Sequence, residues 1–177
     1  RYTVFHAKEA PVATLTDDLS AGFCQALTAC GRSPRPYPHF PDLLTLEWNT
    51  IPQQLQVPLE NPNTSRFRSL ELRLAPDPSW RVPQGQPAFA VVLRDQQGNA
   101  ARVEIPSGVP TLRQFEADPT HGNTSPLYAS ALRIPLGQFA GVDLTAVTSV
   151  ELVFDQAERG RLYLASIEFV GQGNFRF

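Results

Sequence analysis

The stretch Leu70-Glu71-Leu72-Arg73-Leu74-Ala75 decides the fold, because apolar and charged side chains alternate along it. Successive side chains of a β-strand point to opposite faces, so this stretch predicts a strand with one buried face. Similar short stretches lie on both sides of it: 44–48, 55–59, 89–93, 101–105, 127–136, 147–154 and 162–170. Eight short strands that must bury a face predict an all-β fold, a two-sheet β-sandwich.

The connections between these stretches carry turn residues. Asp95-Gln96-Gln97-Gly98-Asn99 separates two of the predicted strands by a short distance, which is typical of a β-hairpin. Residues 106–126 are rich in Pro, Gly, Asp, Asn, Thr and Ser and predict a long loop.

Residues 1–41 have a different pattern and predict a helical or extended lead-in or linker. Thr16-Asp17-Asp18 is a helix-capping sequence, and an apolar stripe of Leu15, Leu19, Phe23 and Leu27 follows helical spacing. Residues 34–41 contain four prolines, which favour an extended and stiff segment. The predicted sandwich therefore occupies residues 42–177.

The composition sets limits on the kind of protein. The chain has 177 residues, of which 42% are hydrophobic and 18% charged, with a formal net charge of −2. That length suits one domain with a sizeable core, and the charge argues against a dedicated nucleic-acid binder. No apolar run approaches the roughly 20 residues that span a bilayer. Because the chain begins at Arg1 and contains no Met, we expect a processed or trimmed chain whose export signal was removed or lies upstream.

The two cysteines, Cys24 and Cys30, are close in sequence and predict one local disulfide, and hence a secreted protein. The alternative is a pair of buried free thiols in a cytosolic protein. Two cysteines without a second pair of ligands do not supply a tetrahedral zinc site. Lys8 is the only lysine, and this preference for arginine is typical of a GC-rich, bacterial genome.

No catalytic motif is present, and we expect no catalytic residue and no cofactor. The chain lacks G-x-S-x-G, H-E-x-x-H and phosphate-loop sequences. His121 with Asp118 and a nearby serine is one conceivable catalytic triad. The alternative is that His121 is a solvated residue of the long loop. Glycoside hydrolysis needs two facing carboxylates, and the strand-borne candidates are Glu47, Glu71, Glu104, Glu151 and Glu168. Outward carboxylates on strands are more often a solvated face.

The second half of the chain resembles galactose-binding-like jelly rolls, the architecture of many carbohydrate-binding modules. The residues that carry this resemblance are Leu132–Leu136, Phe139, Val142–Leu144, Val147–Phe154, Gly160–Leu164 and Ile167–Phe169, with Leu70–Ala75 and Phe89–Gly98 matching the middle strands. The resemblance covers roughly residues 42–170 and implies the fold more strongly than a ligand. Family members often carry an acid near a structural calcium where this chain has Ala165 and Ser166, so we assign no metal.

The candidate ligand-binding residues are Trp80, Tyr128, Trp48 and Arg73. Exposed aromatic rings stack on the faces of sugar rings. Trp80 lies in a polar, proline-rich loop, where such exposure is expected. Trp48 lies at a strand end, and its alternative is a place in the core or at its rim. Arg73 has a solvated strand face as its alternative.

We therefore expect a secreted, non-catalytic accessory domain that binds a neutral polysaccharide or other polymer beside an upstream hydrolase. The runner-up is a structural domain that packs on its own enzyme or a partner protein. A small jelly-roll hydrolase or lyase is the third hypothesis.

Overall fold

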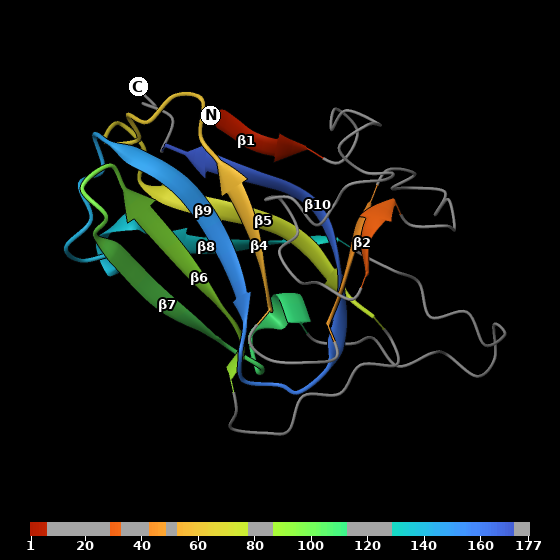
Figure 1. The fold of residues 1–177 in the computed structure, drawn as a ribbon. Helices are drawn as coiled ribbons and strands as arrows, with labels where there is room; N and C mark the ends of the chain where they lie inside the picture. The colour runs from red at the N-terminus through yellow and green to blue at the C-terminus, as the bar shows by residue number, and fades with distance from the viewer. Residues whose placement is uncertain (7–28, 33–42, 49–52, 78–86, 113–128, 172–177) are drawn as a thin grey trace, which may run out of the picture.

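The computed structural model describes residues 1–6, 29–32, 43–48, 53–77, 87–112 and 129–171, which form a β-sandwich (Figure 1). These residues contain ten strands in two antiparallel sheets. In Figure 1 the four-stranded sheet lies in front of the six-stranded sheet. The predicted two-sheet, all-β fold is confirmed.

The six-stranded sheet has the order β2-β3-β10-β5-β8, and β1 pairs with β10 beside this path. Its strands are β1 (Tyr2–His6), β2 (Ala29–Arg32), β3 (Leu44–Trp48), β5 (Ser69–Pro76), β8 (Ser130–Pro135) and β10 (Gly160–Val170). The four-stranded sheet has the order β4-β9-β6-β7. Its strands are β4 (Gln53–Pro58), β6 (Pro87–Asp95), β7 (Ala100–Pro106) and β9 (Val147–Phe154).

From β3 onward, every connection crosses from one sheet to the other, except the hairpin between β6 and β7. This alternation makes the sandwich a jelly roll rather than two independent meanders. Two short 3-10 helices, η1 (Pro110–Leu112) and η2 (Leu136–Gln138), lie in these connections.

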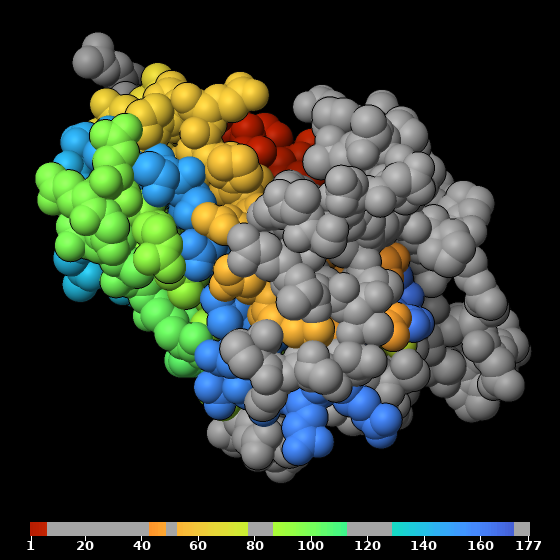
Figure 2. Space-filling view, in the orientation of Figure 1, coloured from red at the N-terminus to blue at the C-terminus, as the bar shows by residue number. Residues whose placement is uncertain are grey.

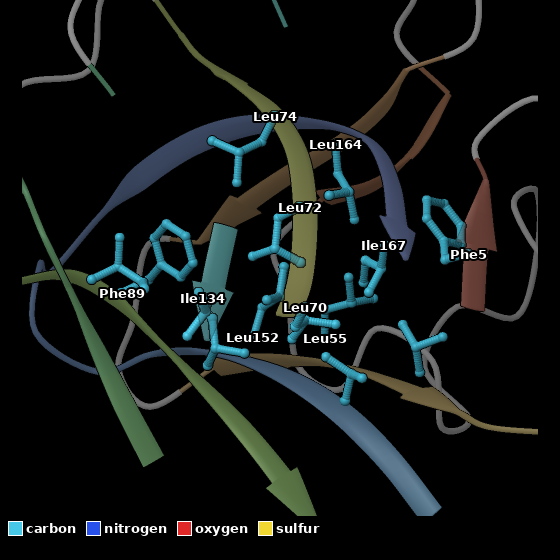
Figure 3. Close-up of a cluster of buried hydrophobic side chains, with 14 of the residues drawn as sticks. Phe5, Leu55, Leu70, Leu72, Leu74, Phe89, Ile134, Leu152, Leu164 and Ile167 are labelled. Carbon is cyan, nitrogen blue, oxygen red and sulfur yellow. The ribbon is translucent and has the colours of Figure 1, made fainter. Parts of the chain in front are cut away.

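The core lies between the two sheets and follows the alternation read from the sequence (Figure 3). Leu70, Leu72 and Leu74 of β5 point into it and are almost fully buried. They meet Leu55, Phe89 and Leu152 from the other sheet, as Figure 3 shows. The residues that alternate with these along each strand point outward and form the two outer faces of the sandwich.

The end of the sandwich that carries the β6–β7 hairpin is held by one buried carboxylate. Asp95 Oδ1 accepts hydrogen bonds from the backbone N–H groups of Gln97 and Asn99, both at 2.9 Å. Asp95 Oδ2 accepts the Asn99 side-chain amide at 2.9 Å and the Asp143 N–H at 3.0 Å. The predicted hairpin is therefore confirmed, and its turn is tied to the loop before β9.

Two strands come from the predicted lead-in, which corrects that prediction. Tyr2 to His6 pairs with β10, and Ala29 to Arg32 pairs with β3. The prediction of a lead-in separate from the sandwich is therefore wrong for these two segments, because non-local pairing places them in the six-stranded sheet. The predicted helix after Thr16 and the proline-rich segment 34–41 lie outside the described residues. So does Cys24, and the disulfide to Cys30 stays a prediction.

Candidate functional site

The candidate site is the outer face of the four-stranded sheet, where the register brings polar side chains from four strands into rows. One row crosses Gln56, Glu151, Val92 and Arg102. The row on one side of it contains Gln54, Val153, Ala90 and Glu104. The row on the other side contains Pro58, Ser149, Arg94 and Ala100. Strands β6, β7 and β9 reach the surface of this face in Figure 2.

The middle of this face has a floor of small and medium side chains. Ala90 and Ser149 are buried although they point away from the core, and Val92 is 7% exposed. Longer polar side chains stand around them, with Arg94 half-buried and Arg102 exposed. Short side chains with longer polar groups around them leave room for contact with a ring that carries hydroxyl groups.

Two ion pairs fix the planar groups of the face. Arg94 donates to both oxygens of Glu151, from Nε at 2.9 Å and from a terminal amino group at 3.4 Å. Ser149 Oγ also donates to the Glu151 carboxylate at 3.3 Å. The hydrogen bond and charge of Glu151 raise the pKa of the Arg94 guanidinium. A buried carboxylate held in this way is a fixed acceptor, because rotation would break both contacts with arginine.

Arg102 is bound more completely than Arg94. Its two terminal amino groups donate to the two oxygens of Asp155, both at 2.7 Å, and its Nε donates to Glu104 at 2.6 Å. The hydrogen bonds from Arg102 hold the pKa of the Asp155 carboxyl below its ordinary value. Three acids and two arginines on this face nearly balance, so the face fits a neutral ligand better than an ion.

No metal site is apparent among the described residues, where no three His, Cys, Asp or Glu side chains gather to hold an ion. In the same part of the chain, no helix is long and apolar enough to cross a membrane. The side chains on the outer face of the four-stranded sheet offer hydrogen bonds and van der Waals contact, which is the chemistry of binding.

The structure corrects the assignment of Trp48 to a ligand. Its side chain is 1% exposed and stacks on Phe154 with ring centroids 4.1 Å apart. Its indole N–H donates to the backbone carbonyl of Ala157 at 2.9 Å. Trp48 ends β3 with its ring turned into the core, so it presents no face to a sugar.

Arg73 lies on the outer face of the other, six-stranded sheet, away from the rows just described. Trp80 and Tyr128 lie outside the described residues. Their loops nevertheless leave from the same end of the six-stranded sheet, because Leu74 near the end of β5 pairs with Ser130 at the start of β8. Strand β6 begins at Pro87, at the end of the four-stranded sheet that is nearest the row of Gln54.

Glycoside hydrolysis would need two facing carboxylates, and the strand register brings one such pair together. Glu71 and Glu168 are partners on β5 and β10. Both are buried, and Arg1 contacts Glu168 at 3.0 Å while Arg133 contacts Glu71 at 2.6 Å. Acids buried beneath arginines are the pattern of an ion-pair network rather than of a carboxylate pair open to substrate.

Sequence reasoning missed the rows of the four-stranded sheet. The signal was present in Gln53-Gln54-Leu55-Gln56-Val57, where amide side chains alternate with apolar ones. The expectation that Glu151 belongs to a solvated strand face is wrong, because its side chain is 4% exposed beside Arg94. What the sequence did not contain was which strands are neighbours.

Comparison with known proteins places this architecture in a class. No family model matches the chain, and no curated protein matches its sequence. A carbohydrate-binding module of family CBM28, described as specific for non-crystalline cellulose, is 13% identical; the match covers 85% of this chain and 86% of that one, with a TM-score of 0.58. An exo-β-agarase is also 13% identical, with a TM-score of 0.52, and the match covers 100% of this chain but 26% of that one.

A family 11 carbohydrate-binding module from a cellulosomal cellulase of Clostridium thermocellum is 10% identical, with a TM-score of 0.48 over 77% of this chain and 79% of that one. The match to the CBM28 module and the order of the strands show that the chain has the jelly-roll β-sandwich fold found in carbohydrate-binding modules, as the resemblance in the sequence implied. At these identities the likeness concerns the fold.

Proposed function

We propose that this chain is a non-catalytic carbohydrate-binding domain that holds a neutral polysaccharide on the outer face of its four-stranded sheet. The observation that carries the proposal is the fixed set of planar groups around a small-residue floor. Arg94 and Glu151 hold each other at 2.9 Å beside the buried Ala90 and Val92. Sugar hydroxyls both donate and accept, so paired carboxylate, guanidinium and amide groups can serve both directions.

The near balance of charge on this face supports a neutral polymer as the ligand. The similarity of the fold to a module described as specific for non-crystalline cellulose makes an unbranched, disordered glycan the first polymer to test. Trp80 and Tyr128 complete the proposal as stacking platforms, since their loops depart from the end of the sandwich that is nearest the row of Gln54.

The biological role that follows is retention of an enzyme at its substrate. A tethered module raises the effective concentration of its catalytic partner at the polymer surface. The match to the exo-β-agarase covers the whole of this chain and 26% of the agarase chain. That enzyme illustrates a domain of this fold within a longer protein. We infer the same setting here, a secreted hydrolase that carries this domain.

Affinity electrophoresis on a panel of neutral polysaccharides, including amorphous cellulose derivatives and agarose, tests the proposal. Wild type is expected to be retarded on at least one polymer, and Gln54→Ala/Gln56→Ala and Trp80→Ala are each expected to weaken retardation about tenfold. Gln97→Ala is the matched control, because Gln97 is an exposed amide on the hairpin turn at the other end of the sheet. Absence of retardation on every polymer would instead favour a structural domain that packs on a partner.

A further inference from the structure

The outer face of the six-stranded sheet carries exposed arginines above buried glutamates. Glu168 pairs with Glu71, and Glu71 pairs with Arg133 on the next strand. The Glu71 and Glu168 side chains are 1% and 8% exposed. The side chains of Arg73 and Arg133 are 44% and 65% exposed. The negative groups therefore lie beneath the surface, and the positive groups meet the solvent.

The way each guanidinium is bound leaves its outer edge open. Arg133 donates to Glu71 Oε2 from Nε at 2.6 Å, and Arg73 donates to Glu71 Oε1 from Nε at 3.4 Å. Within the described part of the chain, no acceptor contacts the terminal amino groups of these two side chains. Arg102 on the opposite face is the contrast, because all three of its nitrogens are bound to carboxylates.

Glu71 acts as a shared anchor for this pair. It is almost fully buried and receives one arginine on each of its two oxygens. Arg1 adds a third positive group, 3.8 Å from Glu71 and 3.0 Å from Glu168. Guanidinium groups that are fixed before a ligand arrives lose less conformational entropy on binding.

We propose that Arg73 and Arg133 form a second binding site, which takes the anionic group of an acidic saccharide. A guanidinium edge with two parallel N–H donors matches the oxygens of a uronate carboxylate or of a sulfate ester. Three guanidinium groups stand here over two buried carboxylates, so the surface that a ligand meets is positive. The chain as a whole has a net charge of −2, so retention on a polyanion does not follow from its overall charge.

This site is separate from the neutral-glycan face, because it lies on the other sheet of the sandwich. A chain with both sites would hold two polymer segments, one on each outer face of the sandwich. Arg73, a candidate ligand-binding residue from the sequence, is thereby given a specific role.

The test is affinity electrophoresis on four polymers: dextran sulfate with unsubstituted dextran, and polygalacturonate with its methyl ester. Wild type is expected to be retarded by at least one anionic polymer and not by its neutral counterpart. Retardation by dextran sulfate alone assigns sulfate, and retardation by polygalacturonate alone assigns carboxylate. Arg73→Gln and Arg133→Gln are each expected to weaken the interaction about tenfold, as loss of a charge-assisted hydrogen bond predicts.

Arg159→Gln is the matched control, because it removes one exposed arginine from the connection between β9 and β10, outside the rows of either outer face, and is expected to bind like wild type. Arg73→Gln and Arg133→Gln each leave Glu71 with two other arginines, so the fold is expected to persist, and circular dichroism checks it. Retardation by neither anionic polymer overturns the proposal. Equal losses in Arg133→Gln and Arg159→Gln also overturn it, because they would indicate general electrostatic attraction. Neither result depends on the neutral-polysaccharide assay.

Discussion

Replacing Trp48 distinguishes a core tryptophan from a sugar platform. The ring is 1% exposed, stacks on Phe154 and donates its N–H to Ala157. Truncation of a buried aromatic to alanine costs about 3–5 kcal/mol, which is a large part of the roughly 5–15 kcal/mol that stabilises a domain. Trp48→Ala is therefore expected to unfold at much lower denaturant concentration than wild type, or to be largely unfolded.

Trp48→Phe gives a measurable intermediate. An aromatic ring remains against Phe154, but the Ala157 carbonyl loses its donor in a buried place. Leaving such a group unsatisfied costs about 1–3 kcal/mol, and the smaller ring adds to this loss. Urea unfolding followed by far-ultraviolet circular dichroism measures both variants without relying on the altered fluorescence.

The control is Gln97→Ala, a change of an exposed side chain that is expected to stay within about 0.5 kcal/mol of wild type. The assignment of Trp48 to the core would be refuted if Trp48→Ala lowered the unfolding free energy by less than about 1 kcal/mol while abolishing retention on a polysaccharide. That outcome is the one expected of an exposed stacking residue.

Three further predictions concern stability. Asp95→Ala removes the acceptor for four hydrogen bonds and is expected to lower the melting temperature in calorimetry, so an unchanged transition would contradict the role given to the hairpin anchor. Burial raises the pKa of Glu71. The hydrogen bonds and charges of its arginines together lower this pKa by more than burial raises it, so the net shift is downward. A lowered folded-state pKa means that this stability is present above the unfolded pKa of about 4.3 and is lost as the pH falls below it. Urea midpoints should therefore decline from pH 6 to pH 3, and decline less in Glu71→Gln. Gly141→Ala should cost about 1 kcal/mol in urea unfolding because its φ is +86°, whereas Gly137→Ala should not; equal costs would argue against backbone strain.

The eight strands from Leu44 to Val170 could be predicted from the sequence, most of them because the buried face shows as a period of two. The exceptions are β6 and β10, which are buried along almost their whole length. Leu70, Leu72 and Leu74 are the clearest case, and all three are in the core. Strands β1 and β2 have five and four residues, and such short segments are stabilised mainly by their neighbours. The partner of β1 is β10, which lies far away in the sequence. The partner of β2 is β3, which lies beyond the proline-rich segment. Local pattern therefore could not place them.

The candidate site was less accessible to sequence reasoning than the fold. Alternation tells which residues of one strand share a face, but a binding surface is made across strands. Gln56, Glu151 and Arg102 form one row only because β4, β9, β6 and β7 are adjacent in that order. The order of strands in a jelly roll depends on crossings between sheets, which no short stretch of sequence encodes.

The two outer faces differ in how their arginines are bound, and this difference is the reason that we propose different ligands for them. Arg102 is enclosed by Asp155 and Glu104, so a ligand would have to displace a carboxylate to reach its charge. Such a group shapes a surface and offers little attraction to an anion. Arg133 uses only Nε on a buried partner, so its charge is compensated from below while its outer edge can still donate. A carboxylate beneath a guanidinium, rather than beside it, therefore fixes the guanidinium without occupying the edge that a ligand needs.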